Sequence, residues 1–153
     1  MQTVLDRRTG AERTFTMVLF ILIVVFFAGC IQQKPEKVPV IEVSFKHYII
    51  SDQHVVEINY VKKTEISLEK VKITKSPPFP SVMAYAIYPK GNKIIVSPVA
   101  YTSIANQGDN ITLYIGIEKD ELPESGTKVD VYVEVWNKAS KKLAADRGEF
   151  VWE

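Results

Sequence analysis

The chain has 153 residues, of which 19 are lysine or arginine, 18 are aspartate or glutamate and 46% are hydrophobic. Residues 1–29 hold three arginines and two carboxylates, which leaves 16 basic and 16 acidic residues from position 30 onward. A formally neutral body offers no positive surface for nucleic acid, so we exclude DNA and RNA as partners. The single cysteine rules out an internal disulfide, so a domain of this length must rely on its hydrophobic core.

An apolar segment, FTMVLFILIVVFFAGCI, covers residues 15–31 and follows a polar start that contains Arg7, Arg8 and Arg13. Basic residues followed by an apolar run and then small residues are typical of a secretory signal peptide. The run is shorter than the roughly 20 residues that a membrane-spanning helix needs, so its length leaves a cleaved signal and an uncleaved anchor open. In both cases the arginines stay on the cytoplasmic side, and residues 32–153 face outward.

The segment ends in Phe27-Ala28-Gly29-Cys30. This stretch resembles the lipobox of prokaryotic lipoprotein precursors, a Leu-Ala/Ser-Gly/Ala-Cys pattern in which Phe27 stands for the usual leucine. The resemblance implies that the chain is cut between Gly29 and Cys30 and that a lipid is attached to the Cys30 thiol. A single acyl chain anchors only weakly, so two chains are expected on this cysteine.

Residues 1–29 are therefore expected to be the signal peptide, and residues 30–39 a flexible tether, because two prolines and no apolar pattern indicate a semi-extended linker. The alternative is a retained N-terminal hydrophobic helix that anchors the chain, with Cys30 a small apolar residue near its end. A signal of the archaeal pilin kind, cut after Gly10, is a third possibility. It requires charge directly before the glycine, where this chain has Thr9.

Beyond the tether the sequence predicts strands, because apolar and polar residues alternate with a period of two. Two stretches, 82–88 and 94–101, are apolar on both faces and are separated by a turn at residues 89–92. A phase slip near residues 69–70 is interpreted as a bulge. The expected strands cover residues 38–46, 55–60, 66–73, 82–88, 94–101, 111–117, 129–135 and 149–152. About seven or eight short strands indicate an all-β antiparallel sandwich over residues 40–153.

One segment, Leu122 to Val133, resembles the E–F corner of fibronectin type III and related immunoglobulin-like domains. It carries Leu-Pro, then Gly-Thr, then alternating valines. Val129 occupies the position of the corner tyrosine, so the usual tyrosine hydrogen bond is absent. The resemblance implies an immunoglobulin-like β-sandwich.

Few residues suggest chemistry. His47 and His54 flank a turn that contains Asp52, and a metal-site interpretation would bring both imidazoles and the carboxylate together. The simpler interpretation makes them exposed polar residues beside a hairpin. Residues 118–121, EKDE, lack the spacing of a calcium loop and are expected to be solvated. No catalytic or phosphate-binding motif occurs, so we expect a non-catalytic protein without cofactor or metal.

Two surface features suggest binding. The proline-rich loop at residues 76–81 presents Phe79 and adjoins Met83, Tyr85 and Tyr88, which together could form a partner surface, although Phe79 could instead plug the end of the sandwich. Asn110 begins an Asn-Ile-Thr sequon and is a possible glycosylation site on an exported domain.

The sequence therefore favours a membrane-tethered lipoprotein of the cell surface, whose sandwich binds a protein or cell-envelope partner near the membrane. One alternative is a signal-anchored accessory subunit of a membrane complex, similar in layout to an archaeal motility (archaellum) stator. Another is an enzyme or metal chaperone that uses His47 and His54. The oligomeric state stays open.

Overall fold

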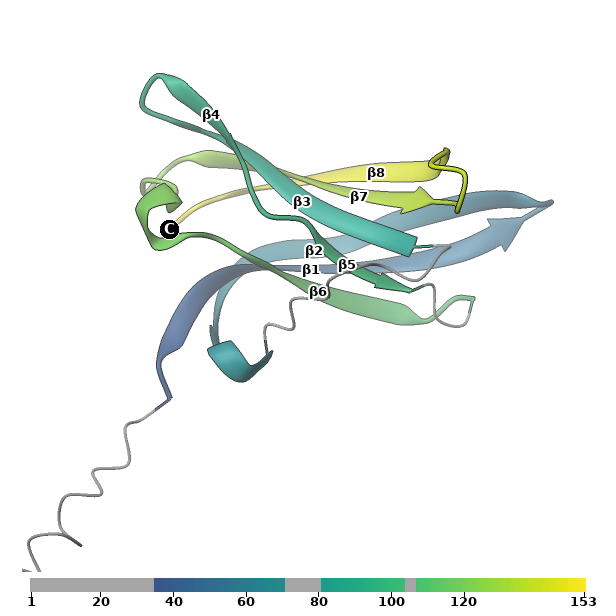
Figure 1. Ribbon diagram of the computed structural model, residues 1–153, viewed down its shortest axis with the longest axis horizontal. Coiled ribbons are helices and arrows are strands. Elements are labelled where there is room, and N and C mark those ends of the chain that lie inside the picture. Colours follow the sequence, from purple (N-terminus) through teal and green to yellow (C-terminus); the bar gives the residue numbers. More distant parts are fainter. Residues whose placement is uncertain (1–34, 71–80, 104–106) are drawn as a thin grey trace, which may run out of the picture. The chain divides into compact units, whose positions relative to one another are not determined.

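The computed structural model describes residues 35–70, 81–103 and 107–153, which belong to one unit spanning residues 35–153 (Figure 1). The predicted signal or anchor segment, the lipobox with Gly29 and Cys30, and the loop with Phe79 lie outside the described residues.

The described residues form two antiparallel sheets that face each other (Figure 1). Sheet A has the strand order β2-β1-β6, and sheet B has the order β4-β3-β7-β8, with β5 paired to the other half of β3. Two short 3-10 helices, η1 (Leu68–Lys70) and η2 (Lys119–Glu121), follow β2 and β6. The strands are β1 (Lys37–Ile50), β2 (Gln53–Ser67), β3 (Ser81–Lys90), β4 (Lys93–Val96), β5 (Ala100–Ser103), β6 (Asn110–Gly116), β7 (Lys128–Trp136) and β8 (Lys142–Val151).

The core lies between the sheets and is built from the inward positions of each strand. Strand β7 contributes four valines that are fully buried, and β1 and β3 contribute alternate residues from the facing sheets. Small side chains at positions 84 and 86 of β3 leave room for the larger ones opposite. The main inward residues are Ile41, Val43, Phe45, Val82, Ala84, Ala86, Tyr88, Ile115, Val129, Val131, Val133 and Val135.

A β-bulge shapes the edge strand β2. Phe45 pairs with Ile58 while the preceding Ser44 pairs with Tyr60, so Asn59 is an extra residue in β2. Because the bulge shifts the alternation by one, Ile58 and Val61 both face Gly148 of β8. Tyr60 then points outward and is 44% exposed.

At the same place β8 comes very close to β2. A Cβ atom built on Gly148 would lie 2.9 Å from the Cγ2 atom of Val61 and 3.4 Å from that of Ile58, so a glycine is needed here. Two residues earlier, a carboxylate oxygen of Asp146 accepts a hydrogen bond of 2.8 Å from the backbone N–H of Ile58. This N–H belongs to an edge strand and would otherwise lack a partner in the sheet. The two contacts join the sheets along one edge.

A serine bridges the break between β4 and β5. The Ser97 hydroxyl accepts a hydrogen bond of 2.8 Å from the backbone N–H of Ala86, and the Ser97 N–H donates to the Ala86 carbonyl at 2.9 Å. Strand β4 pairs with residues 87–90 of β3 and β5 with residues 81–84, so Ala86 falls in the gap between them. The Ser97 hydroxyl therefore accepts the hydrogen bond that a backbone carbonyl of a neighbouring strand would otherwise accept.

The all-β antiparallel architecture is confirmed, as is the turn that separates residues 82–88 from residues 94–101. Other expectations are wrong in detail. Residues 55–60 and 66–67 belong to one long strand, which gives way to η1 at Leu68 instead of continuing through a bulge. A bulge lies instead at Asn59, so Ile58 and Tyr60 point to opposite sides of β2 although they are two residues apart. The stretch 94–101 is interrupted at Ser97, and three of its apolar residues, Ile94, Val96 and Val99, are exposed.

We predict that Gly148→Ala lowers the free energy of unfolding by about 1–3 kcal/mol, because the added methyl group overlaps the stiff Val61 side chain. Denaturant unfolding of the full chain measures the loss. Val61→Ala supplies the control, since it removes the atom that the new methyl group meets. If Gly148→Ala costs the same in the Val61→Ala background, the close approach of β8 to β2 is not the cause.

Candidate functional site

Two histidines meet at the end of the sandwich formed by the β1–β2 hairpin. His47 occupies an inward position of β1, in phase with Val43 and Phe45, and His54 lies diagonally opposite on β2. The Nε2 atom of His47 lies 3.0 Å from the Nδ1 atom of His54, and the rings stack with an angle of 26° between their planes. We call these two residues the histidine pair. The expectation that both are exposed is wrong for His47, which is 1% exposed.

This hydrogen bond needs one proton between two nitrogens, so it cannot form when both facing nitrogens carry hydrogen. Burial, and to a smaller extent the nearby His54, lower the pKa of His47. Among the described residues, the buried Nδ1 atom of His47 finds no hydrogen-bond partner. A positive charge on His47 would therefore be poorly solvated, and the folded chain favours the neutral ring.

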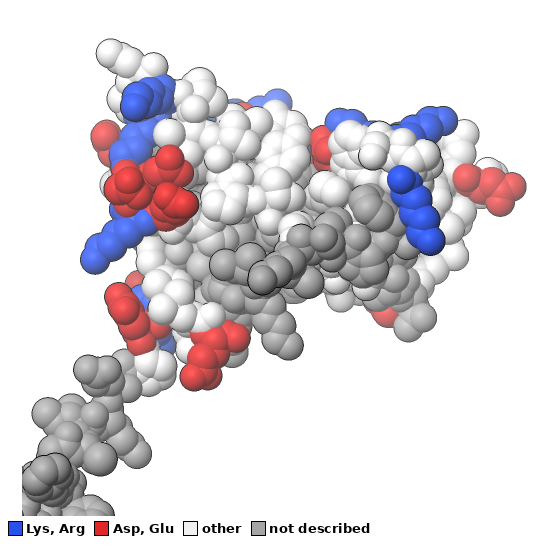
Figure 2. Space-filling view, viewed as in Figure 1, with Lys and Arg blue, Asp and Glu red and all other residues white. Residues whose placement is uncertain are grey.

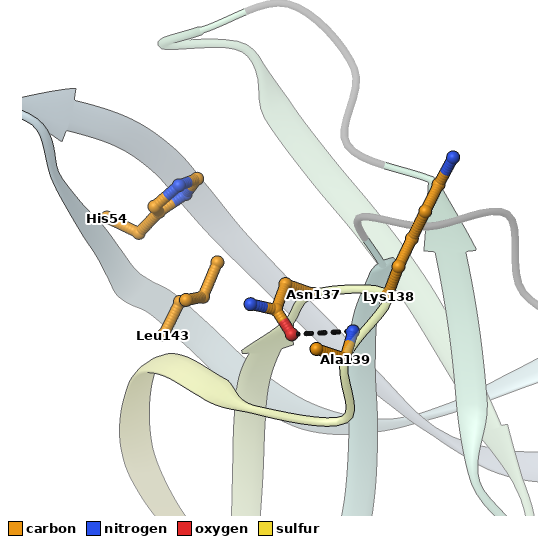
Figure 3. Close-up of a pocket in the computed structure, with 5 residues that line it drawn as sticks. All are labelled: His54, Asn137, Lys138, Ala139 and Leu143. Atoms are coloured by element: carbon orange, nitrogen blue, oxygen red, sulfur yellow. Dashed lines mark hydrogen bonds between the residues drawn. The ribbon is translucent and has the colours of Figure 1, made fainter.

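His54 also lines an open pocket of about 530 Å³ between β2 and the β7–β8 turn (Figure 3). Asn137 shapes this turn, because its side-chain oxygen accepts hydrogen bonds from the N–H groups of Ala139 and Lys141. Leu143 adds an apolar wall, while the Lys138 side chain extends away from His54 (Figure 3). The pocket thus presents one imidazole beside an apolar surface.

The possible metal site is not assembled in the part of the chain that the structure describes. The imidazoles come together, but Asp52 is exposed at the hairpin turn, and no group of three or more histidine, cysteine, aspartate or glutamate residues could hold a metal ion. Asp120 and Glu121 of the acidic stretch lie in η2.

The predicted partner surface divides between the two faces of β3. Met83 and Tyr85 point to the outer face of sheet B and are partly exposed, whereas Tyr88 points inward and is 1% exposed. The Tyr88 hydroxyl donates to the backbone carbonyl of Glu121 at 2.9 Å, and burial raises its pKa to about 12. Tyr88 is therefore a core residue that fixes η2, and it cannot take part in the outer surface.

The outer face of sheet B carries a cluster of which the sequence singled out only Tyr85. Tyr85 stacks on Tyr132 of β7 with ring centroids 5.3 Å apart, and the Arg147 guanidinium lies 5.8 Å from the centre of the Tyr132 ring. On the same face the Lys142 ammonium lies 5.6 Å from the Trp136 ring. We call Tyr85, Tyr132 and Trp136, with their neighbouring cations, the aromatic face.

A carboxylate holds the aromatic face together. Glu134 is only 7% exposed and accepts hydrogen bonds from the Tyr85 hydroxyl at 3.1 Å, the Trp136 indole N–H at 2.8 Å and the Lys142 ammonium at 2.7 Å. Burial raises the pKa of Glu134, but the hydrogen bonds from Lys142, Trp136 and Tyr85 outweigh it, so the pKa lies below its usual value. The carboxylate is ionised at neutral pH and fixes all three side chains.

The sequence feature that could have revealed this cluster is the set of polar and aromatic residues that alternate with the valines of β7. Tyr132, Glu134 and Trp136 occupy every second position of β7, opposite the buried valines. Their partners on β3 and β8 become neighbours only through the strand pairing, which the sequence does not reveal.

The possible glycosylation site lies at the surface. Asn110 is exposed, and its side-chain oxygen accepts a hydrogen bond of 3.0 Å from the Asn59 amide. The Asn110 amide nitrogen, to which a glycan would be attached, is not the atom engaged in this contact.

We predict that the histidine pair makes folding pH-dependent. Because the pKa of His47 lies below its ordinary 6.5 in the folded chain, the unfolded chain binds more protons there below that pH. The stability contribution is complete above pH 6.5 and falls as the pH drops from 6.5 toward the folded pKa. Denaturant unfolding between about pH 7 and pH 5 measures it. His47→Phe should flatten this part of the curve, and identical slopes for both chains would contradict the assignment.

No protein-family model, curated protein or solved structure matches the chain. Within residues 35–70, 81–103 and 107–153, no helix combines the length and the apolar character needed to cross a bilayer.

Proposed function

We propose that this protein is a membrane-tethered, non-catalytic lipoprotein of the cell surface, whose sandwich binds a protein partner close to the membrane through the aromatic face. The observation that carries the proposal is the clustering of Tyr85, Tyr132 and Trp136 with two cations on one outer sheet face. Tyrosine, tryptophan and arginine are the residues that most often dominate protein–protein binding energy.

The geometry of the cluster supports binding in a second way. Since Glu134 fixes Tyr85, Trp136 and Lys142 by hydrogen bonds, these side chains lose little conformational freedom when a partner covers them. Arg147 is held similarly, because its guanidinium donates to Asp130 at 2.7 Å. A prearranged set of aromatic and cationic groups favours a partner surface with complementary acidic and apolar groups.

Two arguments support a non-catalytic role. The Glu134 carboxylate is occupied by three donors, which leaves it poorly placed to take a proton from a substrate. The histidine pair is engaged with itself, and His47 is removed from solvent.

The tether rests on the sequence. Arginines before an apolar run, followed by Ala28-Gly29-Cys30, support export and a lipid on Cys30. A short tether between Cys30 and β1 keeps the sandwich near the membrane and raises its effective concentration for partners on the same surface.

We also propose a relation to immunoglobulin-like sandwiches, with one exchange of strands. The order of strands in sheet B, β4-β3-β7-β8, is compatible with such a domain. In sheet A, however, β1 lies between β2 and β6. The immunoglobulin constant arrangement has the order A-B-E-D, in which the second strand, B, and not the first strand, A, lies beside strand E. The relation therefore requires β1 and β2 to have exchanged places.

The aromatic face is tested by photo-cross-linking of the full chain in its own membranes. A photoreactive residue at Tyr132 should give a defined cross-linked protein, and Trp136→Ala should lower its yield about ten-fold or more, as expected for a central aromatic anchor. Tyr60, which is 44% exposed and lies on sheet A, is the matched control position.

Equal cross-linking from both positions, or a yield that Trp136→Ala leaves unchanged, would contradict the assignment of the binding face. Mass spectrometry of the same membranes reports on the anchor. The proposal requires a lipid-modified peptide that begins at Cys30, and an intact N-terminus would favour the signal-anchored alternative.

A further inference from the structure

The edge of sheet B formed by β4 is apolar and strongly exposed. Of the strands that the structure describes, only β3 pairs with β4, and the outward side chains Ile94 and Val96 of β4 are 67% and 58% exposed. In the view of Figure 2, lysine, arginine, aspartate and glutamate side chains gather toward the two ends of the sandwich, and the described residues drawn between them are mostly uncharged. An exposed, unpaired apolar edge is a template for another strand.

The turn between β3 and β4 determines which backbone groups are free. Gly91 has a φ of +55° at the first position of a two-residue turn, as a type II′ hairpin requires, so Lys90 and Lys93 exchange hydrogen bonds. Along an antiparallel pair, hydrogen-bonded and non-hydrogen-bonded positions alternate. Ile94 and Val96 therefore direct their N–H and C=O groups away from β3. Pro89, opposite Ile94, has no N–H, which agrees with a non-hydrogen-bonded position.

The edge of sheet B at β8 is arranged differently. There Asp146 satisfies the N–H of Ile58, and Gly148 lets β8 lie directly against β2. In the described part of the chain, no side chain hydrogen-bonds to the outward backbone groups of Ile94 or Val96. The contrast indicates that β4 offers a docking edge, while the β8 edge is used within the domain.

We propose that β4 pairs with β4 of a second copy of this chain, antiparallel and about a two-fold axis at Ile95. In this alignment Ile94 lies opposite Val96 of the second copy. The outward backbone N–H and C=O groups of Ile94 and Val96 in both copies then all form hydrogen bonds. Lys93 then lies opposite Ser97, so no like charges face each other. The outward backbone groups are symmetric about Ile95, which is why the edge fits itself.

The proposed contact forms a closed dimer and not a fibre. A two-fold axis at Ile95 uses the β4 edge of both copies, and Pro98 follows directly after Ser97 and lacks the N–H needed to extend the pairing. A four-residue edge buries less than the roughly 1,200 Å² of a stable interface, so we expect a weak dimer.

Cysteine cross-linking tests the alignment directly. Full chains carrying Ile94→Cys and Val96→Cys are mixed and oxidised, because a hydrogen-bonded pair places the Cα atoms about 5.5 Å apart, within the range of a disulfide. The mixture should give at least about ten-fold more disulfide-linked dimer than either variant alone, since identical positions lie too far apart across the axis. The chain without either substitution measures how much disulfide-linked dimer forms through Cys30 alone.

Two further variants guard against misfolding and nonspecific contact. Val96→Lys should abolish dimers in sedimentation velocity of the otherwise unmodified chain, whereas Val151→Lys, which changes a side chain of the same 58% exposure on β8, should not. The proposal is overturned if the mixture gives no more cross-linking than the single variants, or if both lysine variants behave alike.

Discussion

The close approach of β8 to β2 is the constraint on which the other features of this sandwich depend. Gly148 has no side chain where Val61 and Ile58 press against β8, and Asp146 satisfies the backbone N–H of Ile58. This contact fixes the path of β8, and β8 contributes to both candidate sites. Near the start of β8, Leu143 lies beside His54 in the pocket. Lys142 and Arg147, which point outward from β8, lie against the aromatic rings of the aromatic face.

Strand β7 shows how one element can serve stability and binding together. Its inward valines have no exposed surface and fill the core, while its outward positions carry Asp130, Tyr132, Glu134 and Trp136. Because the valines hold the backbone rigidly, the outward side chains keep fixed spacings. Glu134 then acts as an internal acceptor that aligns its neighbours, so that the aromatic face is formed before any partner arrives.

The alternation of apolar and polar residues was enough to predict an all-β antiparallel fold, since a period of two has one physical meaning in a half-buried sheet. The alternation predicted the wrong facing of side chains where a single extra residue shifts the alternation along a strand. The bulge at Asn59 follows from pairing with β1, and the burial of His47 follows from its inward place beside Phe45, so neither is visible in local sequence. The aromatic face was missed for the same reason, because Tyr85 and Tyr132 are 47 positions apart and meet only through strand pairing.

Hydrogen exchange at the backbone amide of Ile58 tests most directly whether the two sheets are joined at this edge. This amide should be well protected in the full chain although it points away from β1, the neighbour of β2 in sheet A, because Asp146 accepts its hydrogen bond. Asp146→Ala should remove that protection, and Asp146→Asn should keep part of it through its remaining side-chain oxygen. An Ile58 amide that exchanges rapidly in the unmodified chain, or equally slowly after Asp146→Ala, would contradict the account.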